Sequence, residues 1–180
     1  MKRKRFYLFF ALCILQTSCS YHHDYPSDWK PLQSSTTTEC PKIKGKYIDK
    51  GESDNRDYNP QLSWYLFRNA APWRETTDVL IDQNDNFLVI TLWNGGQQIF
   101  SRTLKKDSNE FACAEGFVKI DTKEFVNREG ALGKEWSLLG LVKSDGQLVV
   151  KNENGAVGTL FLIPFAGSGT SWYRFKATGE

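Results

Sequence analysis

The chain has 180 residues, a length that suits a single folded domain. It carries 23 basic and 21 acidic residues, and four of the bases lie within residues 1–18, where no acid occurs. Residues 19–180 therefore hold 19 bases and 21 acids, a formal charge of −2. This balance excludes the strongly basic surface that is typical of nucleic-acid binding.

The first residues have the three parts of an export signal. Residues 2–5 read KRKR, residues 6–15 form an uncharged apolar run of ten, and small or polar residues follow at 17–20. This order is typical of a secretory signal peptide. Ten apolar residues are too few for a membrane-spanning helix, which takes about 20. A buried N-terminal helix is the alternative, but four consecutive bases favour export. We therefore predict a signal peptide over residues 1–18.

The end of this signal resembles the lipobox of bacterial lipoproteins through Thr17, Ser18 and Cys19. In that family the chain is cut before the cysteine, and fatty acyl chains such as palmitate then anchor it. The resemblance implies that Cys19 is the lipidation site of a membrane-anchored envelope protein, with no other cofactor. Ser20 stands where an Asp retains such proteins at the inner membrane, so the resemblance implies the outer membrane, on the periplasmic side. Gln16 replaces the usual aliphatic residue, and the alternative is cleavage near Ser20, which would release a soluble periplasmic protein.

Residues 19–39 are predicted to contain the lipidated cysteine and a flexible linker. They are mostly polar, include two prolines, and show neither the period of a strand nor that of a helix. Trp29, Pro31 and Leu32 are the exception. We expect this apolar patch to pack against the domain rather than to dock a partner. A single β-domain is predicted over residues 40–180.

Short β signals alternate with turn residues from residue 40 onward. The pair Asn59-Pro60 is a good helix start, with Asn59 as the cap, and it predicts one short helix over residues 62–67. The predicted strands comprise residues 43–47, 76–83, 87–93, 97–104, 110–114, 116–121, 135–143, 147–152, 159–163 and 171–176.

Glycine-rich turns separate these strands. The triplets at 94–96 (Asn-Gly-Gly) and 144–146 (Ser-Asp-Gly) are strong hairpin signals, because such turns need positive φ angles. Further turns are expected at Asn154-Gly155 and at residues 167–169, whereas residues 122–133 show no clear period.

Tight turns between successive strands predict an antiparallel meander. A meander of this size closes into a small barrel or folds into a sandwich, because either form covers the edges of the sheet. The predicted fold class is therefore all-β, with one short helix. No spacing typical of βαβ units occurs, which argues against a parallel sheet.

The two ends of the domain resemble a poorly characterised group of small bacterial lipoproteins. In that group a Trp-x-Pro-Leu linker precedes a Cys-Pro-x-x-x-Gly-x-Tyr strand, and a Trp-Tyr-Arg-Phe strand closes the chain. These motifs lie here at residues 29–32, 40–47 and 172–175. The resemblance implies a location in the cell envelope and brings no assigned activity.

Cys40 and Cys113 are the cysteines that remain once the signal is removed and Cys19 is lipidated. In an oxidising compartment such a pair most simply forms a disulfide, which we predict here. A metal site is the competing interpretation. The two histidines of the chain, His22 and His23, lie in the predicted linker, so we expect no metal.

The predicted β-domain contains no histidine, which excludes Ser-His and Cys-His catalytic arrangements there. Asp121 and Glu124 form a carboxylate pair of the kind that glycosidases use, but a solvated surface pair is the simpler interpretation. We therefore predict a protein that is not an enzyme. A hydrolase that works without histidine is the alternative.

Aromatic residues are the remaining feature of the domain, and most are expected in its core. In a barrel, some would instead line a cavity for an apolar or lipid-like ligand. The candidates for such a lining are Trp64, Phe67, Trp93, Trp136 and Trp172. The predicted function is that of a non-catalytic accessory or interaction lipoprotein with an envelope protein as its partner. A small barrel that binds an apolar ligand is the alternative.

Overall fold

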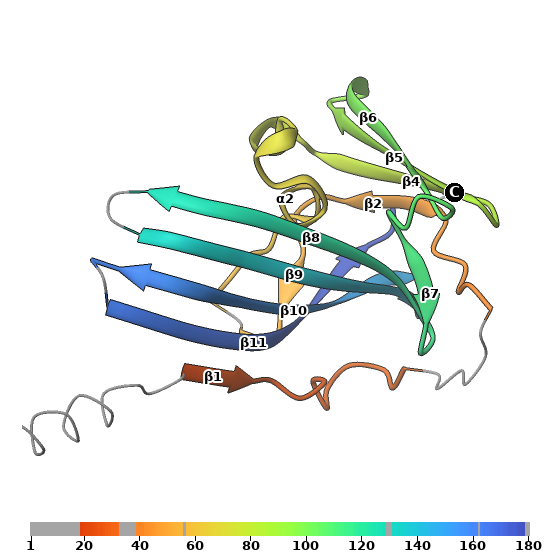
Figure 1. The fold of residues 1–180 in the computed structure, drawn as a ribbon. Helices are drawn as coiled ribbons and strands as arrows, with labels where there is room; N and C mark the ends of the chain where they lie inside the picture. Colours follow the sequence, from red (N-terminus) through yellow and green to blue (C-terminus); the bar gives the residue numbers. More distant parts are fainter. Residues whose placement is uncertain (1–18, 33–38, 56, 129–130, 162, 179–180) are drawn as a thin grey trace, which may run out of the picture.

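The computed structural model describes residues 19–178, apart from 33–38, 56, 129–130 and 162. The predicted signal peptide, residues 1–18, lies outside the described residues. Most of the described chain is strand, arranged in two sheets with one short α-helix, so the predicted all-β class is confirmed. Figure 1 shows the larger sheet below, the smaller sheet at the upper right, and helix α2 beside both. The described strands leave both sheets open, so the arrangement is that of a sandwich rather than a closed barrel.

The larger sheet has seven strands in the order β1-β11-β10-β9-β8-β7, and β3 also pairs with β11. The smaller sheet has four strands in the order β2-β4-β5-β6. All described neighbours are antiparallel except β1, which runs parallel to β11. The strands of the larger sheet are β1 (Cys19–His22), β3 (Glu52–Ser53), β7 (Ala112–Ala114), β8 (Phe117–Arg128), β9 (Ala131–Ser144), β10 (Gln147–Leu160) and β11 (Ile163–Lys176). Those of the smaller sheet are β2 (Gly45–Ile48), β4 (Asp78–Gln83), β5 (Phe87–Asn94) and β6 (Gln97–Lys105).

One hydrophobic core joins the facing sides of the two sheets to helix α2. Val79 and Ile81 are fully buried on β4, as their alternation with polar residues predicts. Leu139 on β9 and Phe175 on β11 are equally buried from the other side. The hairpin turn at Gly95-Gly96 is confirmed, since both glycines have positive φ.

Helix α2 (Leu62–Phe67) has the predicted bounds, but its predicted cap is wrong. The N-cap residue is Gln61 rather than Asn59, and its side chain makes no capping hydrogen bond. Asp49, which follows β2, supplies the cap from outside the helix. Its carbonyl oxygen accepts a hydrogen bond from the N–H of Leu62 at 2.9 Å, and its Oδ1 accepts one from the N–H of Ser63 at 2.7 Å. A cap from another element leaves no local sequence signal. Two short 3-10 turns, η1 (Arg68–Ala70) and η2 (Trp73–Glu75), follow the helix.

The four strands β8 to β11 are longer than the sequence predicts. Residues 122–128 continue β8, and β9 already begins at Ala131. The turns predicted at Asn154-Gly155 and at residues 167–169 are wrong, because these residues lie within β10 and β11.

These internal glycines make room for aromatic rings instead of forming turns. A Cβ on Gly155 would lie 2.5 Å from the Trp136 ring, and a Cβ on Gly169 would lie 2.0 Å from the Tyr21 ring. Each glycine pairs with the aromatic residue on the neighbouring strand, so the ring lies over the glycine backbone. Glycine within a strand often marks such a close approach.

Residues 19–32 lie against the domain, where the sequence predicts a flexible linker. Strand β1 pairs with residues 167–170, and Trp29 is 7% exposed in a second cluster with Val149 and Trp172. The indole N–H of Trp172 also donates a 3.0 Å hydrogen bond to the carbonyl oxygen of His23. The burial of these aromatic rings explains why a mostly polar segment is held in place. The expected packing of Trp29 against its own domain is confirmed.

The structure joins Cys40 to Cys113 in a disulfide, as predicted, with their Cα atoms 5.1 Å apart. The bond ties the segment before β2 to β7 at the rim of the larger sheet. The two cysteines are 73 residues apart. On the chain-entropy model, closing a loop of that length stabilises the fold by about 4 kcal/mol.

Candidate functional site

Two adjoining hollows lie where the end of helix α2 meets the larger sheet. Their volumes are about 380 and 650 Å³, and Arg68, Glu135 and Trp136 line both. We treat them as one groove and call it the α2 groove. Its other described lining residues come from α2, the η1 turn and strands β1, β6, β8, β10 and β11.

The short helix positions the residue at the centre of the groove. Helix α2 buries Leu62, Tyr65, Leu66 and Phe67 and leaves Trp64 half-buried. Arg68 then ends the helix with a φ of 50° and a ψ of −128°, while its N–H donates a hydrogen bond to the carbonyl oxygen of Trp64. A positive φ is costly for a residue other than glycine, and such strain is concentrated at functional sites.

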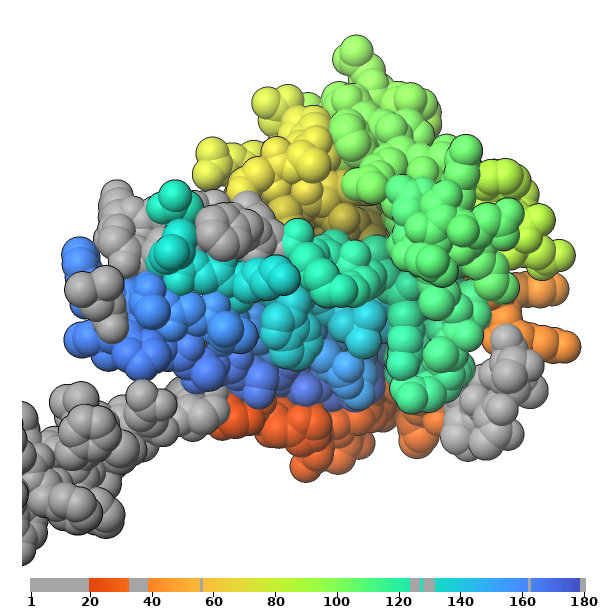
Figure 2. Space-filling model, in the orientation of Figure 1, coloured from red at the N-terminus to blue at the C-terminus, as the bar shows by residue number. Residues whose placement is uncertain are grey.

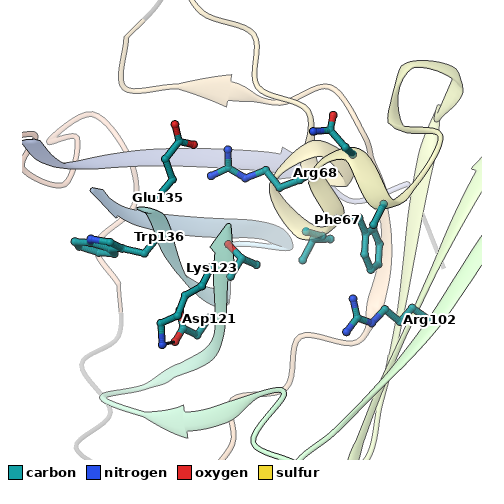
Figure 3. A pocket seen from close by; sticks show the side chains of 11 residues that line it. Phe67, Arg68, Arg102, Asp121, Lys123, Glu135 and Trp136 are labelled. Atoms are coloured by element: carbon teal, nitrogen blue, oxygen red, sulfur yellow. Dashed lines mark ion pairs between the residues drawn. The ribbon is translucent and has the colours of Figure 1, made fainter. Parts of the chain in front are cut away.

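Charged side chains surround the smaller hollow. Figure 3 shows Arg68 extending from the end of α2, Arg102 entering from β6, and Asp121, Lys123 and Glu135 on the larger sheet. Lys123 pairs with Asp121 at 2.6 Å, and Arg102 pairs with Glu110 at 3.2 Å. This hollow therefore offers both signs of charge beside the apolar ring of Phe67.

The larger hollow has amides on its floor. The Ser137 hydroxyl donates a 2.6 Å hydrogen bond to Oδ1 of Asn152, and both residues are buried. The Tyr21 hydroxyl donates to Oδ1 of Asn154 at 3.3 Å and accepts from its Nδ2 at 3.2 Å. These bonds fix the positions of the two amides. A ligand in the hollow would therefore meet donors and acceptors that are already oriented.

Two tyrosines close the inner wall of the larger hollow. The rings of Tyr65 and Tyr173 lie 4.6 Å apart between centroids, and the Tyr65 hydroxyl lies 3.1 Å from that of Tyr58. Burial raises the pKa of both Tyr65 and Tyr173 above the ordinary tyrosine value. Both phenols therefore stay protonated and neutral at neutral pH.

The five aromatic residues predicted to line one apolar cavity do not share one. Trp64, Phe67 and Trp136 do line the α2 groove. Trp93 lies on β5 in the smaller sheet, and Trp172 packs with Trp29 in the second hydrophobic cluster. The prediction assumed a closed barrel, in which strand aromatics would point into one interior. Because the sheets stay open, their opposite faces bury different aromatic residues.

Sequence reasoning missed most of the polar lining. Arg68 follows an apolar helix without a local motif, and Asn152 and Asn154 come from a stretch predicted as the end of a strand and a turn. The alternation of Val150, Asn152 and Asn154 indicates that the strand continues past residue 152, where the sequence predicts a turn. It places all three side chains on one face of the sheet.

Comparison with models of known families, with curated proteins and with solved structures finds no match to this chain. In the part of the chain that the structure describes, no helix has the length and apolar character to cross a membrane. Among those same residues, no three His, Cys, Asp or Glu side chains come together as metal ligands.

Proposed function

We propose that the protein is an envelope lipoprotein, acylated at Cys19, whose β-domain binds a partner through the α2 groove and catalyses no reaction. The observation that carries the anchor is the position of Cys19. It is the first residue of β1, which pairs along the outer edge of β11, so acyl chains on it would start at the edge of the larger sheet. The lipobox-like residues 17–19 make it the acceptor.

Labelling cells with radioactive palmitate tests the anchor. Wild-type protein is expected to take up label, and Cys19→Ala is expected to lose it. Cys13→Ala is the matched control, because Cys13 lies in the apolar run of the predicted signal and is expected to be removed with it. Equal labelling of Cys19→Ala and wild type contradicts the anchor. Label that is kept by Cys19→Ala and lost from Cys13→Ala would place the acyl chain on Cys13 and would also contradict the anchor.

The chemistry of the groove supports binding in preference to catalysis. Arg68 lies with its guanidinium carbon 5.5 Å from the centroid of the Trp64 ring, so a charge and a flat apolar surface are presented together. Arginine and tryptophan are the residues that most often dominate binding energy at protein interfaces. The described lining contains no histidine or cysteine to act as base or nucleophile.

Native mass spectrometry after gentle extraction tests the binding role. Wild-type protein is expected to carry a bound protein, and Arg68→Glu is expected to lose it because the charge at the centre of the groove is reversed. Arg74→Glu is the matched control, since Arg74 is exposed in η2 and lies over Trp73 rather than in the groove. A partner lost equally from both variants contradicts the role of the groove. A retained lipid in place of a protein favours the apolar-ligand alternative.

A further inference from the structure

The strands of the larger sheet expose an apolar end. Phe161 and Ile163, at the tip of the β10–β11 hairpin, are 72% and 70% exposed. Large apolar side chains continue along the same end at Leu132, Val157 and Phe165, all of them exposed. Figure 2 shows the blue ends of β10 and β11 at the surface on the left of the molecule. A cluster of exposed large apolar side chains often marks a contact with a protein or a membrane. We call these residues the apolar tip.

The turns at the two ends of β10 contain different kinds of residue, and hairpin geometry does not require this difference. At one end the turn is Asp145-Gly146, with φ angles of 54° and 73°, the polar residues that such turns favour. At the other end Phe161 takes a φ of 48°, in the left-handed region where glycine or asparagine is usual. A bulky ring in that conformation gains nothing from the turn itself. The domain does not bury this ring, which is therefore free to contact an apolar surface outside it.

The register of β1 places Cys19 at the same end of the sheet. Cys19 pairs with Gly167, four residues along β11 from Ile163. At the strand rise of about 3.3 Å per residue, Cys19 and the tip are ~13 Å apart along the strand. In Figure 1 the start of β1 and the hairpin end of β10 and β11 both lie at the left.

This spacing fits one leaflet of a bilayer. The hydrocarbon core is about 30 Å thick, so each leaflet offers about 15 Å of apolar depth. With acyl chains entering the membrane at Cys19, the tip reaches into the same leaflet and ends before the middle of the bilayer. Pro164, at the part of β11 that β1 does not cover, suits a sheet edge because it has no N–H to leave unpaired.

We propose that the apolar tip is a second membrane contact, which inserts into the lipid surface next to the acyl anchor and orients the domain. This proposal rests on the acylation of Cys19 proposed above. One anchor at Cys19 leaves the domain free to rotate, whereas an anchor and an inserted hairpin together fix which face it presents. The α2 groove, which Phe165 also lines, would then lie close to the membrane surface.

Depth-dependent fluorescence quenching tests the tip directly. The acylated full-length product of Phe161→Cys is labelled with a polarity-sensitive dye and reconstituted into phosphatidylethanolamine–phosphatidylglycerol vesicles that contain spin-labelled lipid. We expect the dye to shift to shorter wavelength and to lose more than half of its emission to the lipid quencher. Phe87→Cys is the matched control, because Phe87 is an exposed phenylalanine at the start of β5, and we expect little quenching there. Ile163→Cys provides a second reporter in case the first variant fails to fold.

Flotation of the same samples separates the two proposals. Protein that does not float with the vesicles contradicts the acyl anchor. Protein that floats, but whose dye at 161 or 163 is quenched no more than at 87, overturns the membrane contact and leaves the anchor standing. The dye could instead be shielded from water without being quenched by the lipid, to an extent that depends on protein concentration. That result would mean that a second copy or another protein covers the tip, and it would also overturn the membrane contact.

Discussion

Oδ1 of Asp49, the residue after β2, accepts a 2.7 Å hydrogen bond from the backbone N–H of Ser63 on α2. Asp49 is fully buried, so this bond and that from Gln61 replace its contacts with water. The bond fixes the start of α2 and, through the helix, the place of Arg68 in the groove.

Replacing Asp49 tests this cap. Asp49→Ala is expected to lower the free energy of unfolding by about 2–3 kcal/mol, because it leaves a buried N–H without an acceptor. Asp49→Asn keeps an acceptor oxygen and is expected to cost less than about 1 kcal/mol. Urea denaturation measures both values. Equal losses for the two variants would show that the hydrogen bond does not carry the effect.

The same carboxyl group predicts a dependence of stability on pH. Burial raises the pKa of Asp49 above its ordinary value of 3.8, and the hydrogen bonds from Ser63 and Gln61 offset this rise only in part. A group whose pKa is higher in the folded protein than in the unfolded chain stabilises the fold when the pH is below its unfolded-state pKa. That stabilisation is lost as the pH rises through its folded-state pKa. The unfolding free energy of wild type minus that of Asp49→Asn is therefore expected to fall as the pH rises from below 3.8 toward neutrality. A difference that grows with pH contradicts the raised pKa.

The sequence predicts this fold best where a structural signal is local. The hairpin glycines at 95–96, the alternation of Val79 and Ile81, and the apolar run of α2 act over a few residues, and the structure confirms all three. The turns predicted at Gly155 and Gly169 are wrong because glycine suits a turn and a ring contact equally well. Only the register of the partner strand distinguishes the two. The α2 groove draws on six strands and a helix that are far apart in the sequence, which explains why its polar lining was missed.

The Tyr21 ring lies over Gly169, where β1 pairs with β11. Gly169→Ala places a methyl group where the Tyr21 ring lies, and it is expected to cost about 1–3 kcal/mol and to release the N-terminal strand. Tyr21→Ala removes the ring, so adding Gly169→Ala to that variant is expected to cost less than about 0.5 kcal/mol more. Unfolding free energies of the four proteins give the coupling, and hydrogen exchange of residues 20–22 reports the release. If the two substitutions lower the unfolding free energy additively, a methyl group at position 169 does not clash with the Tyr21 ring.

The backbone of Arg68 predicts an unusual preference for glycine. Its φ of 50° is easy for glycine and costly for alanine, so Arg68→Gly is expected to be more stable than Arg68→Ala by about 1 kcal/mol. Asn69 is the matched control, because it follows directly and is not among the residues with positive φ. There alanine is expected to be the more stable replacement. Thermal unfolding of the four variants measures both orders, and the same order at both positions would argue against strain at Arg68.

The most direct test of the account is the mass of the N-terminal peptide of the mature protein, purified from its own membranes. A lipoprotein acylated at Cys19 is expected to give a peptide that begins at Cys19 and is heavier than its sequence by a diacylglyceryl group and an N-linked fatty acyl chain. A peptide that begins elsewhere, or a Cys19 that carries a free thiol, would contradict the anchor and with it the membrane contact of the apolar tip.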